Sequence, residues 1–488
     1  MKIFQASIIL MLGLVLLASC AVQSETDVGE LGTSQPPAAI VSTPASQETT
    51  LPAIVVPTLD EPGAVSAGPL CPDAQPPFLT GFAVLTAPSI AEPAPRVPFR
   101  DPIFGACIVR VTDRRADLAP DDPSKGLKNE YSRVSSFNAD GSYILARSIE
   151  AEWYLYDAVS FKLLGCLPLG AEPRWDAGDP NLIYFNDETR LMSYNVVSGE
   201  TNLVHEFSED FANDFPGQSL TAVWTNYEGR PSMDTRYWGL MAEDEDWIPV
   251  AFLVYDRLSD TATIRDMREV DGIQEDVDHV TISPLGDYFL AAFDRYCEHG
   301  QLGDENHPCG LMIYDRDLQN GRGLLRIIGH YDLALDASGR EVAVYQDIDN
   351  DQIAMLDLES GQVIPLLPID FSHTPIGFHF SGLAYDRPGW ALISTYSGGY
   401  PEAFTWMDDQ VFAVELKVGG RVVRLAHTHS KVNPDMEHDY WAEPHASLNR
   451  DFTRVLFTSN WGRSGSEEVE MYLIELPPDW IASLPPAP

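Results

Sequence analysis

Short runs of alternating apolar and polar residues, separated by turn residues, repeat along most of this chain. Three clear copies are Val-Ser-Ser-Phe-Asn-Ala-Asp-Gly-Ser-Tyr-Ile-Leu-Ala at 134–146, a similar run at 280–291 and another at 444–457. Alternation with a period of two predicts β-strands, because successive side chains of a strand point to opposite faces of the sheet. Helical periodicity is nearly absent, so we expect an all-β fold.

The alternating runs fall into seven groups at a spacing of roughly 40 to 60 residues, and each group holds several short strands. The groups span residues 133–169, 174–207, 226–267, 279–328, 330–369, 379–426 and 444–476. Repetition of this kind is typical of a β-propeller, here with seven four-stranded antiparallel blades. The last group contains only three strands before Pro477 and Pro478. We expect residues 107–112 to supply the fourth, which closes the ring and covers a sheet edge.

The first residues read as an export signal. Met-Lys is followed by an apolar run at 8–17 and then by Leu-Ala-Ser-Cys at 17–20. This segment resembles a bacterial lipoprotein signal, which implies cleavage after residue 19 and acylation of Cys20. An ordinary secretory signal is the alternative. We therefore expect the protein at the cell envelope or extracellular surface, in contact with the membrane only through its lipid anchor.

The next segment, residues 20–98, is expected to be a disordered tether. No Lys or Arg occurs between residues 21 and 95, where Pro, Ala, Ser and Thr are abundant. Such a composition buries too little apolar surface to offset the entropy lost on ordering. The propeller domain is predicted at 99–480, with a short tail at 481–488.

The charge balance narrows the range of partners. The chain carries 73 acidic against 31 basic residues, a formal charge of −42. This excess argues against nucleic acid as a partner. Cys297 and Cys309 flank a polar loop, and export permits a disulfide between them. The pairing of Cys71, Cys107 and Cys166 stays open, and we expect a monomer.

Polar residues at the predicted start of the innermost strands are candidates for a site, because a propeller gathers these positions around one axis. The set comprises Tyr131, Arg133, Arg174, Trp175, Asp278, His279, His330, Tyr331, His379, Glu443 and His445. Any one of them alone is explained as a polar residue that caps a strand. As a group they predict a shared funnel.

Imidazoles and a carboxylate in such a funnel suit a divalent metal such as Mn²⁺ or Zn²⁺, with Ca²⁺ as a further candidate. Glu443 and His445 are two residues apart and so share one side of a strand. His427 and His429 have the same spacing and form a second candidate pair.

The stretch at 443–462, Glu-Pro-His-Ala-Ser-Leu-Asn-Arg-Asp-Phe-Thr-Arg-Val-Leu-Phe-Thr-Ser-Asn-Trp-Gly, resembles the last-blade motif of oligogalacturonate-lyase-like and TolB-like propellers. In those lyases a His-Pro-His-Pro-Ser motif supplies histidine ligands to a manganese-like ion. A Gln three residues earlier and a histidine from an earlier blade complete the ligands. By this resemblance His445 matches the second histidine, Glu443 replaces the first and Tyr440 stands in place of the Gln. His379 is then the ligand from the earlier blade.

The resemblance implies a polysaccharide lyase that cleaves a uronate-containing glycan by β-elimination. A metal at His379, Glu443 and His445, or Arg174 and Arg133 in bidentate contact, would neutralise the uronate carboxylate. The base is expected to be His330 or His279, and Tyr131 would protonate the leaving oxygen. Two other classes stay open, a non-catalytic TolB-like propeller that binds glycan or protein and a hydrolase with paired carboxylates.

Overall fold

A computed structural model describes residues 69–486, except for 74, 216, 218, 271–276, 372–375, 398–404 and 434. The predicted signal segment, most of the predicted tether and Cys20 lie outside the described residues. Contacts divide the chain into two units, Met1–Leu59 and Asp60–Pro488, and all of the described residues belong to the second.

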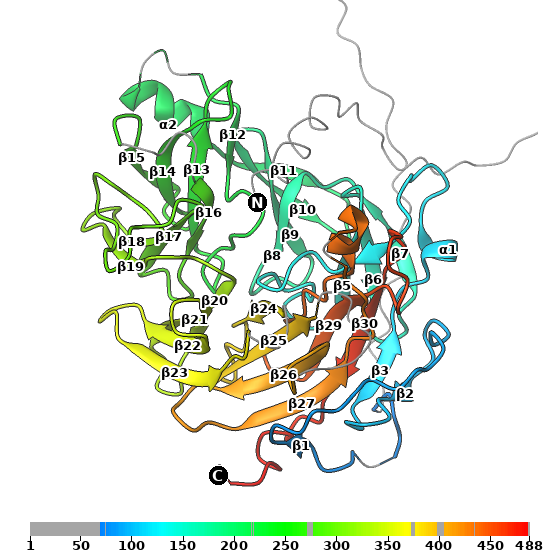
Figure 1. The fold of residues 1–488 in the computed structure, drawn as a ribbon. Coiled ribbons are helices and arrows are strands. Elements are labelled where there is room, and N and C mark those ends of the chain that lie inside the picture. Colours follow the sequence, from blue (N-terminus) through cyan, green and yellow to red (C-terminus); the bar gives the residue numbers. More distant parts are fainter. Residues whose placement is uncertain are drawn as a thin grey trace, which may run out of the picture. The chain divides into compact units, whose positions relative to one another are not determined.

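The described chain forms a seven-bladed β-propeller, as the alternation predicts. Seven antiparallel sheets follow one another around a ring (Figure 1). Five of them have four strands that follow one another in chain order, and two have five strands. Blade one contains β4 (Leu127–Lys128), β5 (Tyr143–Ser148), β6 (Trp153–Asp157) and β7 (Leu163–Leu167). Blade two contains β8 (Ala171–Trp175), β9 (Leu182–Asp187), β10 (Arg190–Asn195) and β11 (Thr201–Glu206).

The next three blades repeat this arrangement. Blade three contains β12 (Ala222–Trp224), β13 (Tyr237–Glu243), β14 (Pro249–Asp256) and β15 (Thr261–Asp266). Blade four contains β16 (Val277–Ile282), β17 (Tyr288–Phe293), β18 (Leu311–Asp315) and β19 (Arg322–Leu325). Blade five contains β20 (Tyr331–Leu335), β21 (Glu341–Asp347), β22 (Gln352–Asp357) and β23 (Val363–Pro368). Cys297 and Cys309, in the connection between β17 and β18, form a disulfide.

The last two blades gain strands from the N-terminal part of the chain. Blade six contains β24 (Gly377–Ser381), β25 (Trp390–Tyr396), β26 (Gln410–Glu415) and β27 (Val422–His427), with β1 (Leu79–Thr80) added at its edge. Blade seven contains β28 (Ser447–Leu448), β29 (Arg454–Ser459) and β30 (Glu470–Glu475), followed by β3 (Cys107–Arg110) and β2 (Phe99–Arg100).

Strand β3 closes the ring. It pairs antiparallel with β30, with Cys107 opposite Glu475 and Arg110 opposite Tyr472. The predicted fourth strand of the last blade is therefore confirmed. The sheet of β29 and β30, orange-red in Figure 1, consequently holds both ends of the ring and lies beside the cyan first blade.

Apolar side chains from neighbouring sheets meet between the blades. Met241 and Phe252 of blade three, for example, share a core cluster with Phe289 and Tyr314 of blade four. The Phe252 and Phe289 rings lie 5.0 Å apart between centroids. Both faces of the central strands are covered by neighbouring blades, so these strands carry apolar side chains on both faces. Burial of each large apolar side chain contributes about 1.5–3 kcal/mol to the stability of the folded state.

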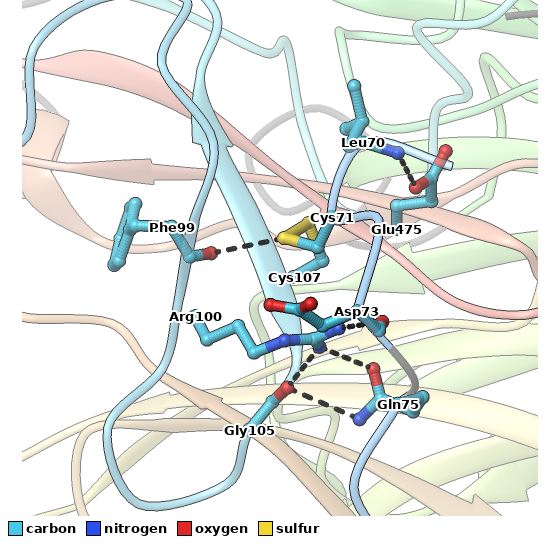
Figure 2. Close-up of a disulfide and its surroundings, with 9 residues drawn as sticks. All are labelled: Leu70, Cys71, Asp73, Gln75, Phe99, Arg100, Gly105, Cys107 and Glu475. Carbon is cyan, nitrogen blue, oxygen red and sulfur yellow. Dashed lines mark hydrogen bonds between the residues drawn. A yellow bond between two sulfur atoms is a disulfide. The ribbon is translucent and has the colours of Figure 1, made fainter. Parts of the chain in front are cut away.

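A strap of residues N-terminal to β2 is packed against blades six and seven. Cys71 forms a disulfide with Cys107, and the Leu70 amide donates to Glu475 (Figure 2). Arg100 donates to the Asp73 carbonyl and to Gln75 in the same place. The predicted domain start at residue 99 leaves out this strap, which holds the ring closure from outside. At the other end Leu484 belongs to the core cluster of blades six and seven, within the predicted tail.

Helices are few in the described part of the chain. They are α1 (Arg114–Asp117), α2 (Phe207–Asp214) and the 3-10 helix η1 (Glu437–Ala442). Among the described residues no helix has both the length and the apolar character needed to cross a membrane.

Candidate active site

The predicted site residues lie on the inner strands or in the segments beside them. His379 lies on β24, and Glu443 and His445 lie in the turn between η1 and β28. His279 lies on β16, His330 directly before β20, and Tyr131 and Arg133 follow β4. Residues from five blades therefore meet around the axis, as the sequence predicts.

His379, Glu443 and His445 form one compact cluster. One potential ligand atom from each side chain lies within 4.8 Å of the others. Nε2 of His379 is 2.7 Å from Oε2 of Glu443, and Nε2 of His445 is 3.8 Å from the same oxygen. The two imidazole centroids are 4.2 Å apart. The donor set is thus two imidazoles and one carboxylate, which is a familiar ligand set of catalytic zinc sites.

Backbone contacts hold His445 in place. Its φ of 42° lies in the left-handed region, which is unfavourable for a residue with a side chain. Asn129 donates to the His445 carbonyl at 2.6 Å, and Ser394 accepts from the Ala446 amide at 3.0 Å. These contacts, from blades one and six, maintain a strained conformation of the kind found at functional sites.

The protonation states suit metal binding. Burial lowers the pKa of His379 to about 3 and the pKa of His445 well below its usual value, so both imidazoles are neutral near neutral pH. Burial also raises the pKa of Glu443 to about 7, against the opposing effect of its contact with Tyr396. Neutral imidazole is the form that binds a metal.

The unsatisfied ring nitrogens provide a direct test of whether this site fits a metal. Nδ1 and Nε2 of His445 and Nδ1 of His379 are buried without a hydrogen-bond partner among the described residues. Buried polar atoms are otherwise almost always paired. An ion binds one nitrogen of each imidazole, and an ion bound to Nε2 of His445, which lies 3.8 Å from Glu443, would satisfy that atom, so the donor set fits a divalent metal.

A second polar cluster surrounds Arg133. Its Nη1 lies 2.6 Å from Nε2 of His279 and 2.9 Å from Oε2 of Glu228. Nδ1 of His279 lies 2.9 Å from the Asp278 carboxylate, and Nε2 lies 2.8 Å from the Tyr331 hydroxyl. If Nδ1 carries the proton and donates to Asp278, Nε2 is a lone-pair acceptor that faces Arg133 and Tyr331. Glu228, Asp278 and His279 also form a compact group of potential ligand atoms, but the Arg133 guanidinium already compensates their charge.

Tyr131 lies between the two clusters. Its ring centroid is 4.9 Å from His445 and 5.5 Å from His379, and the Arg133 guanidinium lies 5.6 Å from it. Burial raises the pKa of Tyr131 well above its usual value, so the phenol keeps its proton. The two clusters are therefore parts of one site.

His330 belongs to the first cluster. Its ring packs edge-on against His379 at 4.8 Å, and burial lowers its pKa to about 3. A base with so low a pKa accepts a proton weakly. Of the two predicted bases, His279 is the one that a carboxylate orients.

Arg174 differs from its predicted role. Nη1 donates to both oxygens of Glu130 at 3.0 and 2.9 Å, and Nε and Nη2 donate to the Gly229 carbonyl. Nη2 also donates to the Tyr227 carbonyl. The Arg174 guanidinium thus donates its hydrogen bonds to other groups of the protein and is not presented to a ligand. Of the two arginines predicted for the site, only Arg133 lies in it.

The second candidate histidine pair does not form a ligand set. His427 stacks on Phe104 at 4.5 Å, and His429 stacks on Trp461 at 4.3 Å. His427 also contacts the Leu85 carbonyl of the strap at 3.2 Å. These histidines pack the strap and blade seven together.

Sequence reasoning missed several members of the site. Glu228 lies in the irregular connection between β12 and β13, and Tyr396 lies at the end of β25. Neither residue is at the start of an inner strand, which was the signal used to select site residues. Lys128 and Arg147 are on β4 and β5 of blade one. Lys128 comes before the first clear alternating run, so its strand was not recognised. Arg147 is a basic residue inside a strand, and nothing in its sequence context indicates that it lies near the axis.

Comparisons with known proteins support the fold. No family model matches the chain, and no curated protein matches it in sequence. Among solved structures, an oligogalacturonate lyase from Vibrio parahaemolyticus is similar with a TM-score of 0.52 and 12% identity, over 78% of this chain and 97% of that chain. The β-propeller domain of Myceliophteria thermophila Cps50 (Swd1) and the Kuenenia stuttgartiensis hydrazine synthase each give a TM-score of 0.42 at 12% identity, over 72% of this chain and 98% of that chain. At 12% identity the likeness to the oligogalacturonate lyase shows the propeller fold alone.

Proposed function

We propose that the protein is a polysaccharide lyase that cleaves a uronate-containing glycan by β-elimination at the axis of the propeller. The observation that carries the proposal is one site that joins a metal-type donor set, His379, Glu443 and His445, to a histidine oriented by a carboxylate. The similar structure from Vibrio parahaemolyticus is that of an oligogalacturonate lyase, which is consistent with this activity.

The reaction removes a proton from the carbon beside the uronate carboxylate, forms a carbon–carbon double bond and breaks the bond to the leaving glycosidic oxygen. His279 accepts the proton at Nε2 and is oriented by Asp278 at 2.9 Å. Tyr131, which retains its proton, donates to the leaving oxygen. Each substrate proton lost is balanced by one delivered to the product.

The uronate carboxylate must be neutralised for its neighbouring carbon to become acidic. Arg133 provides a buried guanidinium next to His279. A divalent ion held by His379, Glu443 and His445 would act there as a Lewis acid on the same carboxylate. Mn²⁺ and Zn²⁺ suit this nitrogen-rich donor set better than Ca²⁺, which prefers oxygen ligands.

A non-catalytic propeller that binds a glycan or a protein is the second candidate. One observation favours it: His379 and Glu443 already form a direct 2.7 Å hydrogen bond, which partly satisfies both without an ion. Metal content separates the two functions, because a binding scaffold has no need for a stoichiometric divalent ion.

We propose that the substrate is reached from the cell envelope or extracellular surface, with the chain exported and attached through an acylated Cys20. Mass measurement of the mature N-terminus from the native host tests this proposal. A free, unmodified Cys20 in the membrane fraction would contradict it.

Activity is tested by incubating the purified protein with uronate polysaccharides, with and without Mn²⁺, and following unsaturated product in the near ultraviolet. His279→Ala and His445→Ala should abolish product formation. His438→Ala is the matched control, because the His438 side chain is 55% exposed and lies 3.0 Å from the Glu467 carboxylate. Full activity in both site variants would end the assignment.

A further inference from the structure

Gly377 lies directly opposite Tyr396 where strands β24 and β25 pair. A glycine in a strand weakens it and often marks the close approach of another group. The φ of Gly377 lies outside the left-handed region, so its backbone conformation does not require glycine. A Cβ at Gly377 would lie 2.2 Å from Cζ of Tyr396 and 2.6 Å from its hydroxyl oxygen. The end of the Tyr396 side chain therefore occupies the space that any other residue at 377 would fill.

From this position Tyr396 contacts two of the proposed metal ligands. Its ring stacks on His379, with 5.7 Å between centroids and 30° between planes. Its hydroxyl forms a hydrogen bond with the Glu443 carboxylate. Burial, and secondly the charge of Glu443, raise the pKa of Tyr396 above its usual value, so the phenol keeps its proton. The phenol is thus the donor and the carboxylate the acceptor.

The hydrogen bond from Tyr396 differs from the contacts that Glu443 makes with the two histidines. Nε2 of His379 lies 2.7 Å from Oε2 of Glu443, and Nε2 of His445 lies 3.8 Å from the same oxygen. An ion with these side chains as ligands would replace the direct contact between His379 and Glu443. Tyr396 lies outside the donor set, so its hydrogen bond can persist while an ion is bound. Outer hydrogen bonds of this kind orient the ligands of metal sites.

We propose that Tyr396 is a positioning residue of this site. Its hydroxyl orients the Glu443 carboxylate toward a divalent ion, and Gly377 leaves the space through which the hydroxyl reaches that carboxylate. This inference rests on the proposed function, in which Glu443 is a metal ligand. It follows that residue 377 affects metal binding without touching the ion, and does so only through Tyr396.

An aromatic ring packed over a glycine also stabilises a pair of strands in its own right. The Tyr396 ring packs against the apolar cluster that contains Ile149 and Val469, which fits such a structural role. Tyr396→Phe separates the two roles, because phenylalanine keeps the ring and lacks the hydroxyl. A purely structural ring predicts unchanged metal affinity in this variant, and a positioning hydroxyl predicts a loss.

The test measures the affinity of the purified full chain for Mn²⁺ and for Zn²⁺ by isothermal titration calorimetry, in the absence of any glycan. Tyr396→Phe should weaken binding about 10- to 100-fold, the range for loss of an outer hydrogen bond to a metal ligand. Gly377→Ala should have a similar effect, because the added Cβ displaces the Tyr396 hydroxyl. Tyr194→Phe is the matched control, since Tyr194 is a 5% exposed tyrosine on β10 of blade two. It should leave both affinities unchanged.

A double variant tests whether Gly377 acts through Tyr396. Tyr396→Ala removes the ring, so adding Gly377→Ala to it should weaken metal binding by less than about 2-fold more. Gly178→Ala is the control for the added methyl group, because a Cβ at Gly178 would have its nearest neighbour at 3.5 Å, an ordinary contact distance. Where Gly377→Ala fails to fold, Tyr396→Phe carries the test, because its ring stays in place.

The outcomes separate this inference from the lyase proposal. Weaker metal binding by Tyr396→Phe, in a protein whose circular dichroism matches the wild type, supports the positioning role even where no unsaturated product forms. Wild-type metal affinity in Tyr396→Phe would overturn the positioning role and leave measured lyase activity intact. A wild-type chain that binds neither ion would overturn it as well, and so would a double variant in which the two losses multiply.

Discussion

Nε2 of His379 lies 2.7 Å from Oε2 of Glu443, although the two residues are 64 positions apart in the chain. His379 comes from the inner strand of blade six, and Glu443 precedes that of blade seven. The contact therefore depends on the closed ring, which places successive inner strands side by side. Nε2 of His445, which is buried without a hydrogen-bond partner among the described residues, lies 3.8 Å from the same Glu443 oxygen.

Loss of any one member of this cluster should remove tight binding of Mn²⁺ or Zn²⁺. We expect His445→Ala and Glu443→Gln to weaken affinity by more than roughly 100-fold, since loss of outer partners alone weakens metal affinity about 10- to 100-fold. Metal content after dialysis, measured by elemental mass spectrometry, checks the expectation. His438→Ala should keep wild-type content. Equal metal content in the wild type and both variants would place the ion elsewhere.

Asp278 is expected to act as a positioning residue. Its carboxylate lies 2.9 Å from Nδ1 of His279 and selects the tautomer in which Nε2 accepts a proton. Asp278→Asn should lower kcat by about 10²-fold, within the range for impaired general-base catalysis, with little change in KM. The pH profile of kcat/KM should shift with it. A rise in KM alone, at unchanged kcat and pH profile, would show that Asp278 serves only to bind substrate.

The sequence allowed the fold to be predicted because period-two alternation survives in every blade. Strand β3 could be recognised as the closing strand because its run at 107–112 has that alternation. Of the strap, only the apolar run at 78–85 gave a reason to expect contact with the domain. Strand β1 lies in a proline-rich segment without alternation, and the strap is held by tertiary contacts such as Phe78 against Trp480 at 5.8 Å. Sequence patterns report which face of a strand is buried, but not which irregular segment covers it.

Part of the site could be predicted because the alternating pattern locates the inner strand of most blades. Residues at the start of inner strands share the axis, so His379, Glu443 and His445 could be grouped before the structure was known. The engagement of Arg174 depends on Glu130, which is 44 positions earlier in the chain. No spacing rule connects these two residues, because their contact is set by the packing of blade one against blade two.

The disulfide between Cys71 and Cys107 should contribute to the stability of the closed ring. It joins the strap to β3, the strand that pairs with β30 (Figure 2). The double variant Cys71→Ser with Cys107→Ser should lose roughly 2–4 kcal/mol of unfolding free energy, because the cross-link restricts the unfolded chain over a separation of 36 residues. Urea denaturation checks this value.

Cys297→Ser with Cys309→Ser is the matched control. This disulfide spans 12 residues and lies within a single connection of blade four. A smaller loss is expected for it, because the shorter loop gives a smaller entropic effect. Equal losses for the two double variants would show that the strap does not specifically stabilise the ring.

Glu341 should make stability fall as the pH rises. It begins β21, is 7% exposed and accepts a hydrogen bond from the Leu285 amide of the neighbouring blade at 2.5 Å. Burial raises the pKa of Glu341 from 4.5 to about 7. Since the folded state favours the protonated carboxyl, its contribution is complete below pH 4.5 and is lost as the pH rises through about 7.

Glu341→Gln keeps an oxygen that accepts from Leu285 but cannot ionise. Relative to the wild type, the variant should be more stable by roughly 3 kcal/mol at pH 8 and nearly unchanged at about pH 4.5, as the shift in pKa requires. Urea denaturation at the two pH values measures the difference. Glu245→Gln, at an exposed turn position, should change stability little at either pH. A gain for Glu341→Gln that is the same at both pH values would mean that packing, and not ionisation of the buried carboxyl, limits stability at this position.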